Sequence, residues 1–338
     1  MLRNKWKGLG AAVTLTAALI VSGCGGSVAP SATGSPQGNG LQDVKVMLEW
    51  SPNTNHTGLY AAEALGYYEE EGLDVEIMMP SSAGVNQVVA SGEVDFGISV
   101  QEEVTLARTQ GIPVVSLATI IQHNTSGFAA PKALGIKTPK DFEGKTYGGW
   151  GSPTEQAIIQ AVMSEAGADF SKLNIVSIGE NDFFTAQKNG IDLQWVFYAW
   201  TGIEAELRGE PVDMVYLKDY SEKLDYYTPI IVTNEDHIAN QSELVKKFMR
   251  ATSRGYTYAI EHPAEAAELL IGAVPEINAE LVRASQEWLS PKYAEDAPRW
   301  GEQKLEVWQN YADFMVEHSL LEGEFDASQA FTNEFLPE

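Results

Sequence analysis

The chain is poor in positive charge and in cysteine. Its 338 residues hold 22 Lys and Arg against 47 Asp and Glu, for a formal charge of -25, and one Cys. Such an excess of acid repels phosphate backbones and anionic lipids, so nucleic acid and polybasic docking on membranes are disfavoured. A single Cys excludes an internal disulfide and a metal site built on cysteines. The length predicts two domains with sizeable cores.

The usual signatures of catalysis are also missing. The sequence has no G-x-S-x-G elbow, no H-E-x-x-H motif and neither of the glycine-rich nucleotide fingerprints. Its histidines lack the spacing of metal ligands, and they are His56, His123, His237, His262 and His318. We therefore expect a protein that binds a neutral or cationic small molecule, with no metal, no cofactor and no catalytic residues.

The N-terminus predicts the compartment. Arg3, Lys5 and Lys7 precede an apolar run over residues 9–21 that is too short to span a bilayer, as in a signal peptide. The run ends in VSGC, which resembles a bacterial lipobox, in which cleavage precedes the cysteine and its thiol is diacylated. We expect residues 1–23 to be a lipoprotein signal peptide and Cys24 to be the lipid anchor at the extracytoplasmic face of the membrane. An incidental Cys24 after an ordinary cleavage site is the alternative.

Residues 24–40 are rich in Gly and Ser and carry no charge, so they read as a flexible tether. Strands and helices alternate from residue 41, which predicts a mostly parallel sheet with helices on both faces. A second α/β unit of similar plan follows Gly127, and the β-rich run 228–233 could return the chain to the first. Residues 242–338 read as almost entirely helical.

This pattern predicts an α/β protein with two lobes. We expect lobe 1 to comprise residues 41–126 and 230–338, and lobe 2 to comprise residues 127–229. Open α/β sheets bind ligands beyond the carboxyl ends of their strands, so a ligand cleft is expected between the lobes.

Four loops that follow predicted strands supply the candidate ligand contacts. They combine aromatic rings, amides and carboxylates with very little positive charge, which suits a flat heteroaromatic compound that bears amino groups. Phosphate and sulfonate would be poorly matched. The predicted contacts are Trp50, Asn53, His56, Ser99, Gln101, Glu102, Trp150, Ser152, Glu155, Asp192, Trp195 and Tyr198.

Each loop also has a purely structural interpretation. Asn53 could cap a helix, and Gln101 and Glu102 could form a solvated helix start. Ser152 and Glu155 match a capping box with proline at the first helical position, so a helix is expected to begin there. Strand alternation places Trp195 on the face opposite Tyr198, so some aromatics of the fourth loop must lie in the core.

Several long strings identify a family resemblance. LEWSPNTNHTGLYAA, SGEVDFGIS, KTYGGWGSPTEQ and GYTYAIEHPAEAAELL resemble the ThiY-like formylaminopyrimidine-binding proteins of ABC importers. The resemblance implies a type II periplasmic-binding-protein fold that closes on its ligand like a hinged trap, with an ABC permease as partner. It implies capture of N-formyl-4-amino-5-aminomethyl-2-methylpyrimidine, or of hydroxymethylpyrimidine, for thiamine salvage.

Two alternatives remain open. The resemblance extends to the fungal enzymes that make the thiamine pyrimidine, which carry a lysine and, four residues on, a catalytic histidine after the D-x-G strand. Those positions hold Ser99 and Glu103 here, and the cysteine-rich motif of the enzymes is absent. The other alternative is a receptor for a compound such as an alkylsulfonate, which would need an Arg or Lys in the cleft; none occurs in the four loops.

Overall fold

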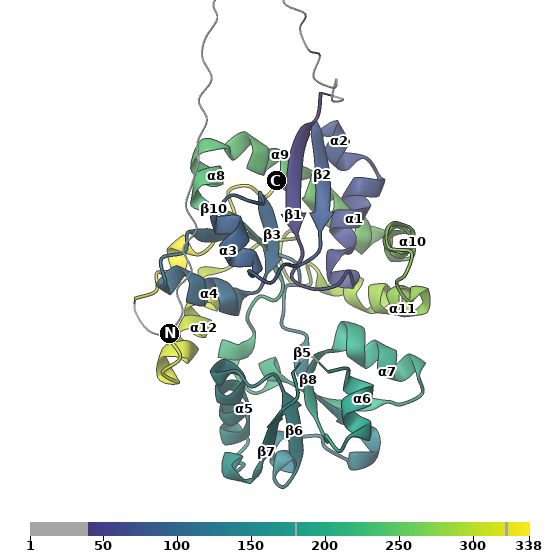
Figure 1. The fold of residues 1–338 in the computed structure, drawn as a ribbon, viewed down its shortest axis with the longest axis vertical. Helices are drawn as coiled ribbons and strands as arrows, with labels where there is room; N and C mark the ends of the chain where they lie inside the picture. Colours follow the sequence, from purple (N-terminus) through teal and green to yellow (C-terminus); the bar gives the residue numbers. More distant parts are fainter. Residues whose placement is uncertain (1–39, 180, 322–323) are drawn as a thin grey trace, which may run out of the picture. The chain divides into compact units, whose positions relative to one another are not determined.

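The computed structural model describes residues 40–179, 181–321 and 324–338 (Figure 1). By their contacts, residues 40–338 group into one unit. The predicted signal peptide, Cys24 and almost all of the tether lie outside the described residues. Within the described ranges, no helix is both long enough and apolar enough to cross a membrane.

The first sheet has the strand order β2-β1-β3-β10-β4. β1 pairs in parallel with β2 and β3, whereas β10 lies antiparallel between β3 and β4. Every residue of β3 and β4 is buried, as expected for strands covered on both faces. The mostly parallel sheet and the returning strand are thus confirmed. Its strands are β1 Gln42–Met47, β2 Leu73–Met78, β3 Phe96–Ser99, β4 Val114–Thr119 and β10 Ile230–Asn234.

The second layer of strands repeats this order. β5 lies antiparallel between β8 and β9, and β6 pairs in parallel with β7. A parallel bridge from Tyr147 in β6 to Leu193, just before β8, joins the pair β6-β7 to the three strands β8-β5-β9. The resulting order is β7-β6-β8-β5-β9. The similar plan of the two units is confirmed, with β5 in the place of β10. These strands are β5 Ser126–Pro131, β6 Thr146–Gly149, β7 Asn174–Ser177, β8 Gln194–Phe197 and β9 Val212–Tyr216.

The chain passes between the two layers twice. The first crossing segment, residues 120–125, leads from β4 into β5, and the second, residues 217–229, leads from β9 into β10. Each antiparallel strand therefore comes directly after a crossing. The exact division into two lobes remains a prediction, because residues 40–338 form a single compact unit.

Two helices that cross closely, α1 Thr57–Ala64 and α9 Ser242–Glu261, pack against the first sheet. The apolar face of α9 places Phe248 parallel to Phe96 of β3, with ring centroids 3.8 Å apart. Where α9 crosses α1, a Cβ on Gly255 would lie 2.0 Å from the carbonyl oxygen of Gly58. The remaining α-helices are α2 Tyr67–Glu70, α3 Val85–Ala90, α4 Gln101–Thr109, α5 Pro153–Glu165, α6 Phe183–Lys188, α7 Ile203–Leu207, α8 Glu235–Asn240, α10 Pro263–Ala273, α11 Ala279–Leu289 and α12 Leu305–Glu317.

The C-terminal segment corrects one prediction. Helices account for much of residues 242–317, but the described residues after Glu317 contain only one short 3-10 turn, Ala327–Gln329. Phe331 instead forms a parallel bridge with Ser116 of β4, whose N–H donates to the Ala330 carbonyl at 2.8 Å. The chain thereby covers the outer edge of β4, an edge that would otherwise be free to pair with another strand. Here the pairing with a distant strand determines the structure, and the helical spacing of apolar residues that predicted a helix does not.

Candidate functional site

Two tryptophans occupy corresponding places in the two layers of strands. Trp50 follows β1 and Trp150 follows β6, and β1 and β6 hold the same position in the repeated strand order. Each of the two residues is 50% exposed. Open α/β sheets bind ligands beyond the carboxyl ends of their strands, so we take this pair of tryptophans as the candidate site.

The indole of Trp150 lies against that of Trp195 in β8. Their ring centroids are 5.3 Å apart with the planes tilted by 47°. Trp195 is partly buried, and its other contact is an edge-on packing against the core ring of Phe128 at 5.8 Å. Two predicted contacts from separate loops are thus brought together, with the inner ring anchored in the core and the outer ring exposed.

The carboxylate of Glu155 fixes the loop that carries Trp150. It is fully buried and accepts hydrogen bonds from the N–H of Gly151 at 2.7 Å, the N–H of Trp150 at 3.2 Å and the hydroxyl of Tyr147 at 2.6 Å. The Ser152 hydroxyl caps α5 by accepting from the Glu155 N–H at 3.0 Å, so the predicted helix start is confirmed. Both oxygens of Glu155 are thus engaged, and the residue holds the Trp150 loop in place.

Glycines permit this tight loop. A Cβ on Gly149 would lie 2.0 Å from the carboxylate of Glu155, and Gly151 has a φ of +87°, which disfavours other residues. The GGWG string therefore has a structural cause: the backbone approaches the buried carboxylate on both sides of Trp150.

The first loop is organised around a buried imidazole. His56 is fully buried, with Nδ1 accepting from the N–H of Asn53 at 3.2 Å and Nε2 lying 2.9 Å from Oε2 of Glu49. The Asn53 side chain accepts from the N–H of Asn55 at 2.8 Å, so the capping interpretation of Asn53 is confirmed. Sequence reasoning did not single out Glu49, whose side chain keeps 20% of its surface exposed beside Trp50.

The second loop is directed mainly into the interior. Ser99 is buried, and the buried amide of Gln101 accepts from the N–H of Tyr227 at 2.8 Å and donates to the Val307 carbonyl at 3.3 Å. Gln101 thus ties the start of α4 to the second crossing segment, a role that its sequence position did not reveal.

Glu102 has an unusual environment. Burial raises the pKa of its carboxyl group to about 7, and the neighbouring Glu103 charge adds to the rise. Its Oε2, like the hydroxyls of Tyr226 and Tyr311, is buried without a hydrogen-bond partner among the described residues. The ring of Tyr226 in turn lies 4.6 Å from that of Tyr311. The interpretation as a solvated helix start does not hold for Oε2 of Glu102, which is buried, although the residue as a whole is partly exposed and Glu103 on the same turn is exposed.

The fourth loop departs most from expectation. Asp192 accepts from the N–H of Thr146 at 2.8 Å, which places it at the amino end of β6, whereas Trp150 follows the carboxyl end. β8 ends at Phe197, and Tyr198 begins a π-helix, Tyr198–Gly202, so strand alternation does not apply beyond Phe197. The structure does not bring Asp192 together with the Trp150 loop.

Tyr198 is engaged elsewhere. Its hydroxyl donates to Glu206, and its ring centroid lies 5.1 Å from that of Trp288 in α11.

Two surface hollows lie along α12 and between α7 and α11. None of the predicted site residues, all within the described part of the chain, lines either one. Among residues 40–179, 181–321 and 324–338, no cluster of His, Cys, Asp or Glu is arranged to hold a metal ion.

The two layers with their inserted antiparallel strands have the architecture of the periplasmic binding proteins. The crystal structure of the aliphatic sulphonate-binding protein of Escherichia coli matches with a TM-score of 0.66 at 14% identity, over 86% of this chain and 97% of that one. The NMT1/THI5-like family model matches residues 53–266. The chain belongs to this family, which confirms the resemblance noted in its sequence.

Two relatives show the functional range of similar sequences. The formylaminopyrimidine-binding protein of Halalkalibacterium halodurans is 28% identical over 301 residues, covering 87% of this chain and 90% of that protein. The 4-amino-5-hydroxymethyl-2-methylpyrimidine phosphate synthase of Legionella pneumophila is 30% identical over 300 residues, covering 87% and 92% respectively. The named relatives thus include a binding protein and an enzyme, both concerned with substituted pyrimidines.

Proposed function

We propose that this protein is an extracytoplasmic solute-binding lipoprotein that captures an aminopyrimidine precursor of thiamine and delivers it to an ABC permease. The candidate ligands are N-formyl-4-amino-5-aminomethyl-2-methylpyrimidine and hydroxymethylpyrimidine. The observation that carries the proposal is the Trp150 and Trp195 pair, with Trp50 at the corresponding place in the first sheet. The similarity to a formylaminopyrimidine-binding protein over most of the chain supports it.

In this proposal the pyrimidine ring stacks on the exposed face of Trp150, and closure brings Trp50 to its other side. An offset aromatic pair contributes about 0.5–1.5 kcal/mol beyond the burial of its surface. Glu49 is the proposed acceptor for an amino group, since it lies beside Trp50 and remains partly exposed. Glu155 and Asp192, with their oxygens engaged by the backbone, act as supports of the loop and of the strand.

A pyrimidine synthase is the second candidate, and the Legionella relative favours it. By the resemblance to the fungal enzymes, their lysine and histidine correspond to Ser99 and Glu103 here. Ser99 is buried and offers no amine for a Schiff base. The only cysteine of the chain is Cys24, in the predicted anchor. We therefore propose that the protein binds the pyrimidine and does not make it.

Calorimetric titration tests the proposal with formylaminopyrimidine, hydroxymethylpyrimidine, thiamine and taurine. We expect binding confined to the aminopyrimidines and a loss of affinity of about tenfold or more for Trp150→Ala and for Trp50→Ala. Trp288→Ala, an aromatic outside the four loops, is the matched control and should leave the affinity unchanged. Equal affinity of wild type and both folded tryptophan variants would refute the stacking, and pyrimidine formation from pyridoxal phosphate and iron would establish the enzyme instead.

A further inference from the structure

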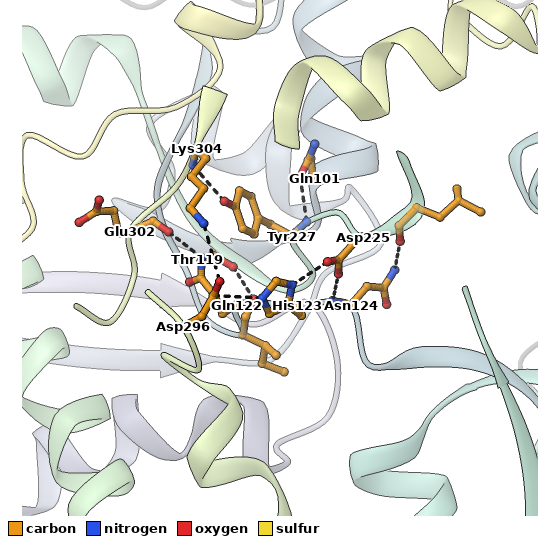
Figure 2. Close-up of polar contacts among 12 residues, drawn as sticks. Gln101, Thr119, Gln122, His123, Asn124, Asp225, Tyr227, Asp296, Glu302 and Lys304 are labelled. Atoms are coloured by element: carbon orange, nitrogen blue, oxygen red, sulfur yellow. Dashed lines mark hydrogen bonds and ion pairs between the residues drawn. The ribbon is translucent and has the colours of Figure 1, made fainter. Parts of the chain in front are cut away.

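His123 connects three separate segments of the chain. It lies in the first crossing segment, and its Nδ1 is 2.6 Å from Oδ2 of Asp225 in the second crossing segment (Figure 2). Its Nε2 is 3.1 Å from Oδ1 of Asp296, in the segment that precedes α12. One imidazole ring thus joins both crossing segments to the C-terminal part of the chain.

This arrangement requires a protonated ring. A neutral imidazole has one N–H donor and one lone pair, whereas an ionised carboxylate can only accept. With a carboxylate at each nitrogen, both hydrogen bonds form only when the ring is an imidazolium. The hydrogen bond to Asp225 raises the pKa of His123 above its ordinary value against the opposing effect of burial, and Asp296 and Glu295 add to the rise.

The two hydrogen bonds of His123 differ in what supports them. The other oxygen of Asp225 accepts from the N–H of Asn124 at 2.8 Å, so the two crossing segments stay joined whatever the charge on the ring. Asp296 is 59% exposed, and Lys304 is the cation near it, with Nζ 4.0 Å from Oδ2. A neutral ring that keeps its proton on Nδ1 retains Asp225 and loses Asp296.

We propose that His123 is a proton-gated clamp that adds a hydrogen bond from the crossing segments to Asp296 of the C-terminal segment and gives up that bond when the ring loses its proton. The hydrogen bonds from Gln122 to the carbonyls of Lys292 and Glu302 do not depend on this proton and remain. The crossing segments are the covalent connections between the two layers of strands, so any relative movement of the layers must bend them. The Asp296 contact is one of several ties to the C-terminal segment, so its loss lowers the resistance to bending without removing the other ties. The inference rests on the fold and on these contacts, and does not depend on the identity of the ligand.

Glu102 lies near the clamp and also changes its charge near neutral pH, so its effect must be distinguished from that of His123. It lies against Tyr226, the residue after Asp225, and ionises near pH 7 because burial raises its pKa to about 7. Its ionisation loosens the same crossing segment as the pH rises, so it would imitate the release of Asp296. Glu102→Gln removes this second titration and leaves His123 as the group under test.

The first measurement is an NMR titration of the histidine rings in the folded protein, with His123 assigned by its absence in His123→Gln. We expect His123 to titrate above the ordinary pKa of about 6.5 and Asp296→Asn to lower its pKa. Because Asp296 is exposed, this variant should fold normally. Titration of His123 at or below the ordinary value, or no change in Asp296→Asn, would overturn the proposal.

The second measurement is amide hydrogen exchange, corrected for intrinsic rates, in the Glu102→Gln background. Between about pH 6 and about pH 8.5 we expect the protection of residues 120–125 and 225–229 to fall about tenfold, the equivalent of one charge-assisted hydrogen bond. The added His123→Gln change should abolish this dependence, and His262→Gln, which alters a histidine outside the clamp, should preserve it. The same fall with and without His123 would overturn the proposal.

Discussion

The buried carboxylate of Glu155 accepts a 2.7 Å hydrogen bond from the N–H of Gly151, the residue immediately after Trp150. The first turn of α5 therefore sets the position of an exposed aromatic ring that precedes it in the chain. Among the described residues, the hydrogen-bond donors to this carboxylate are two backbone N–H groups and a tyrosine hydroxyl, which stabilise it without a cation.

Glu155→Gln should destabilise the protein by about 1–3 kcal/mol, because an amide nitrogen replaces one acceptor and faces backbone donors. The Trp150 loop should loosen with it, so the affinity for the pyrimidine should fall as well. Urea unfolding measures the first effect and calorimetric titration the second. Glu165→Gln, at the exposed other end of the same helix, is the control and should change neither. Unfolding of Glu155→Gln at the wild-type urea concentration would contradict this account of the loop.

Gly255→Ala should destabilise the contact between α9 and α1 by about 1–3 kcal/mol or more, since the added Cβ would meet the rigid backbone oxygen of Gly58 at 2.0 Å. Gly272→Ala in α10 provides the opposite case. Nothing lies within 4 Å of its added Cβ, so the variant should be about 0.5–1 kcal/mol more stable than wild type. Thermal unfolding of the two variants gives the comparison, and similar shifts for both would contradict the close packing of the two helices.

Stability should fall as the pH rises because of Glu102. Burial raises the pKa of this carboxyl group from its ordinary value of 4.5 to about 7, so the fold favours the protonated form. This contribution is fully present below pH 4.5 and is lost as the pH rises through 7, at a cost of about 3 kcal/mol.

Glu102→Gln should remove that part of the pH dependence, because glutamine stays neutral while keeping the shape of the side chain. Urea unfolding at about pH 5 and about pH 8 in both proteins measures the difference. Glu103→Gln on the same turn is more exposed and should change the dependence less. If wild type and Glu102→Gln lose equal stability between the two pH values, another group must account for the loss.

Local patterns predicted local structure well. The start of α5 follows from Ser152, Pro153 and Glu155, which are adjacent in sequence, and the cap at Asn53 involves its immediate neighbours. The alternation of strand and helix patterns along the chain from residue 41 predicted the strands of the first sheet and the helices between them. The family resemblance then indicated the particular fold.

The remaining features depend on partners that are distant in sequence. The environment of Glu102 is made by Tyr226 and Tyr311, and the charge on His123 depends on Asp225 and Asp296, none of which has a recognisable spacing in the sequence. The exposure of Trp150 could be anticipated from its flanking glycines. Its contact with Trp195 could not, because it depends on β6 and β8 lying next to each other. Prediction from sequence therefore located the loops better than the roles of their side chains.

The insertion of β10 between β3 and β4 affects the order in which the protein can assemble. The strands of the second layer, β5 to β9, come from one uninterrupted stretch of chain, whereas the first sheet lacks the strand that joins β3 to β4 until Ile230–Asn234 has been synthesised. Pairings between distant segments form late because the intervening chain must first be ordered. During synthesis, β3 and β4 thus keep unpaired edges until Ile230–Asn234 is available. The sheet that begins first in the chain is completed last, and its unpaired strand edges are exposed to aggregation in the meantime.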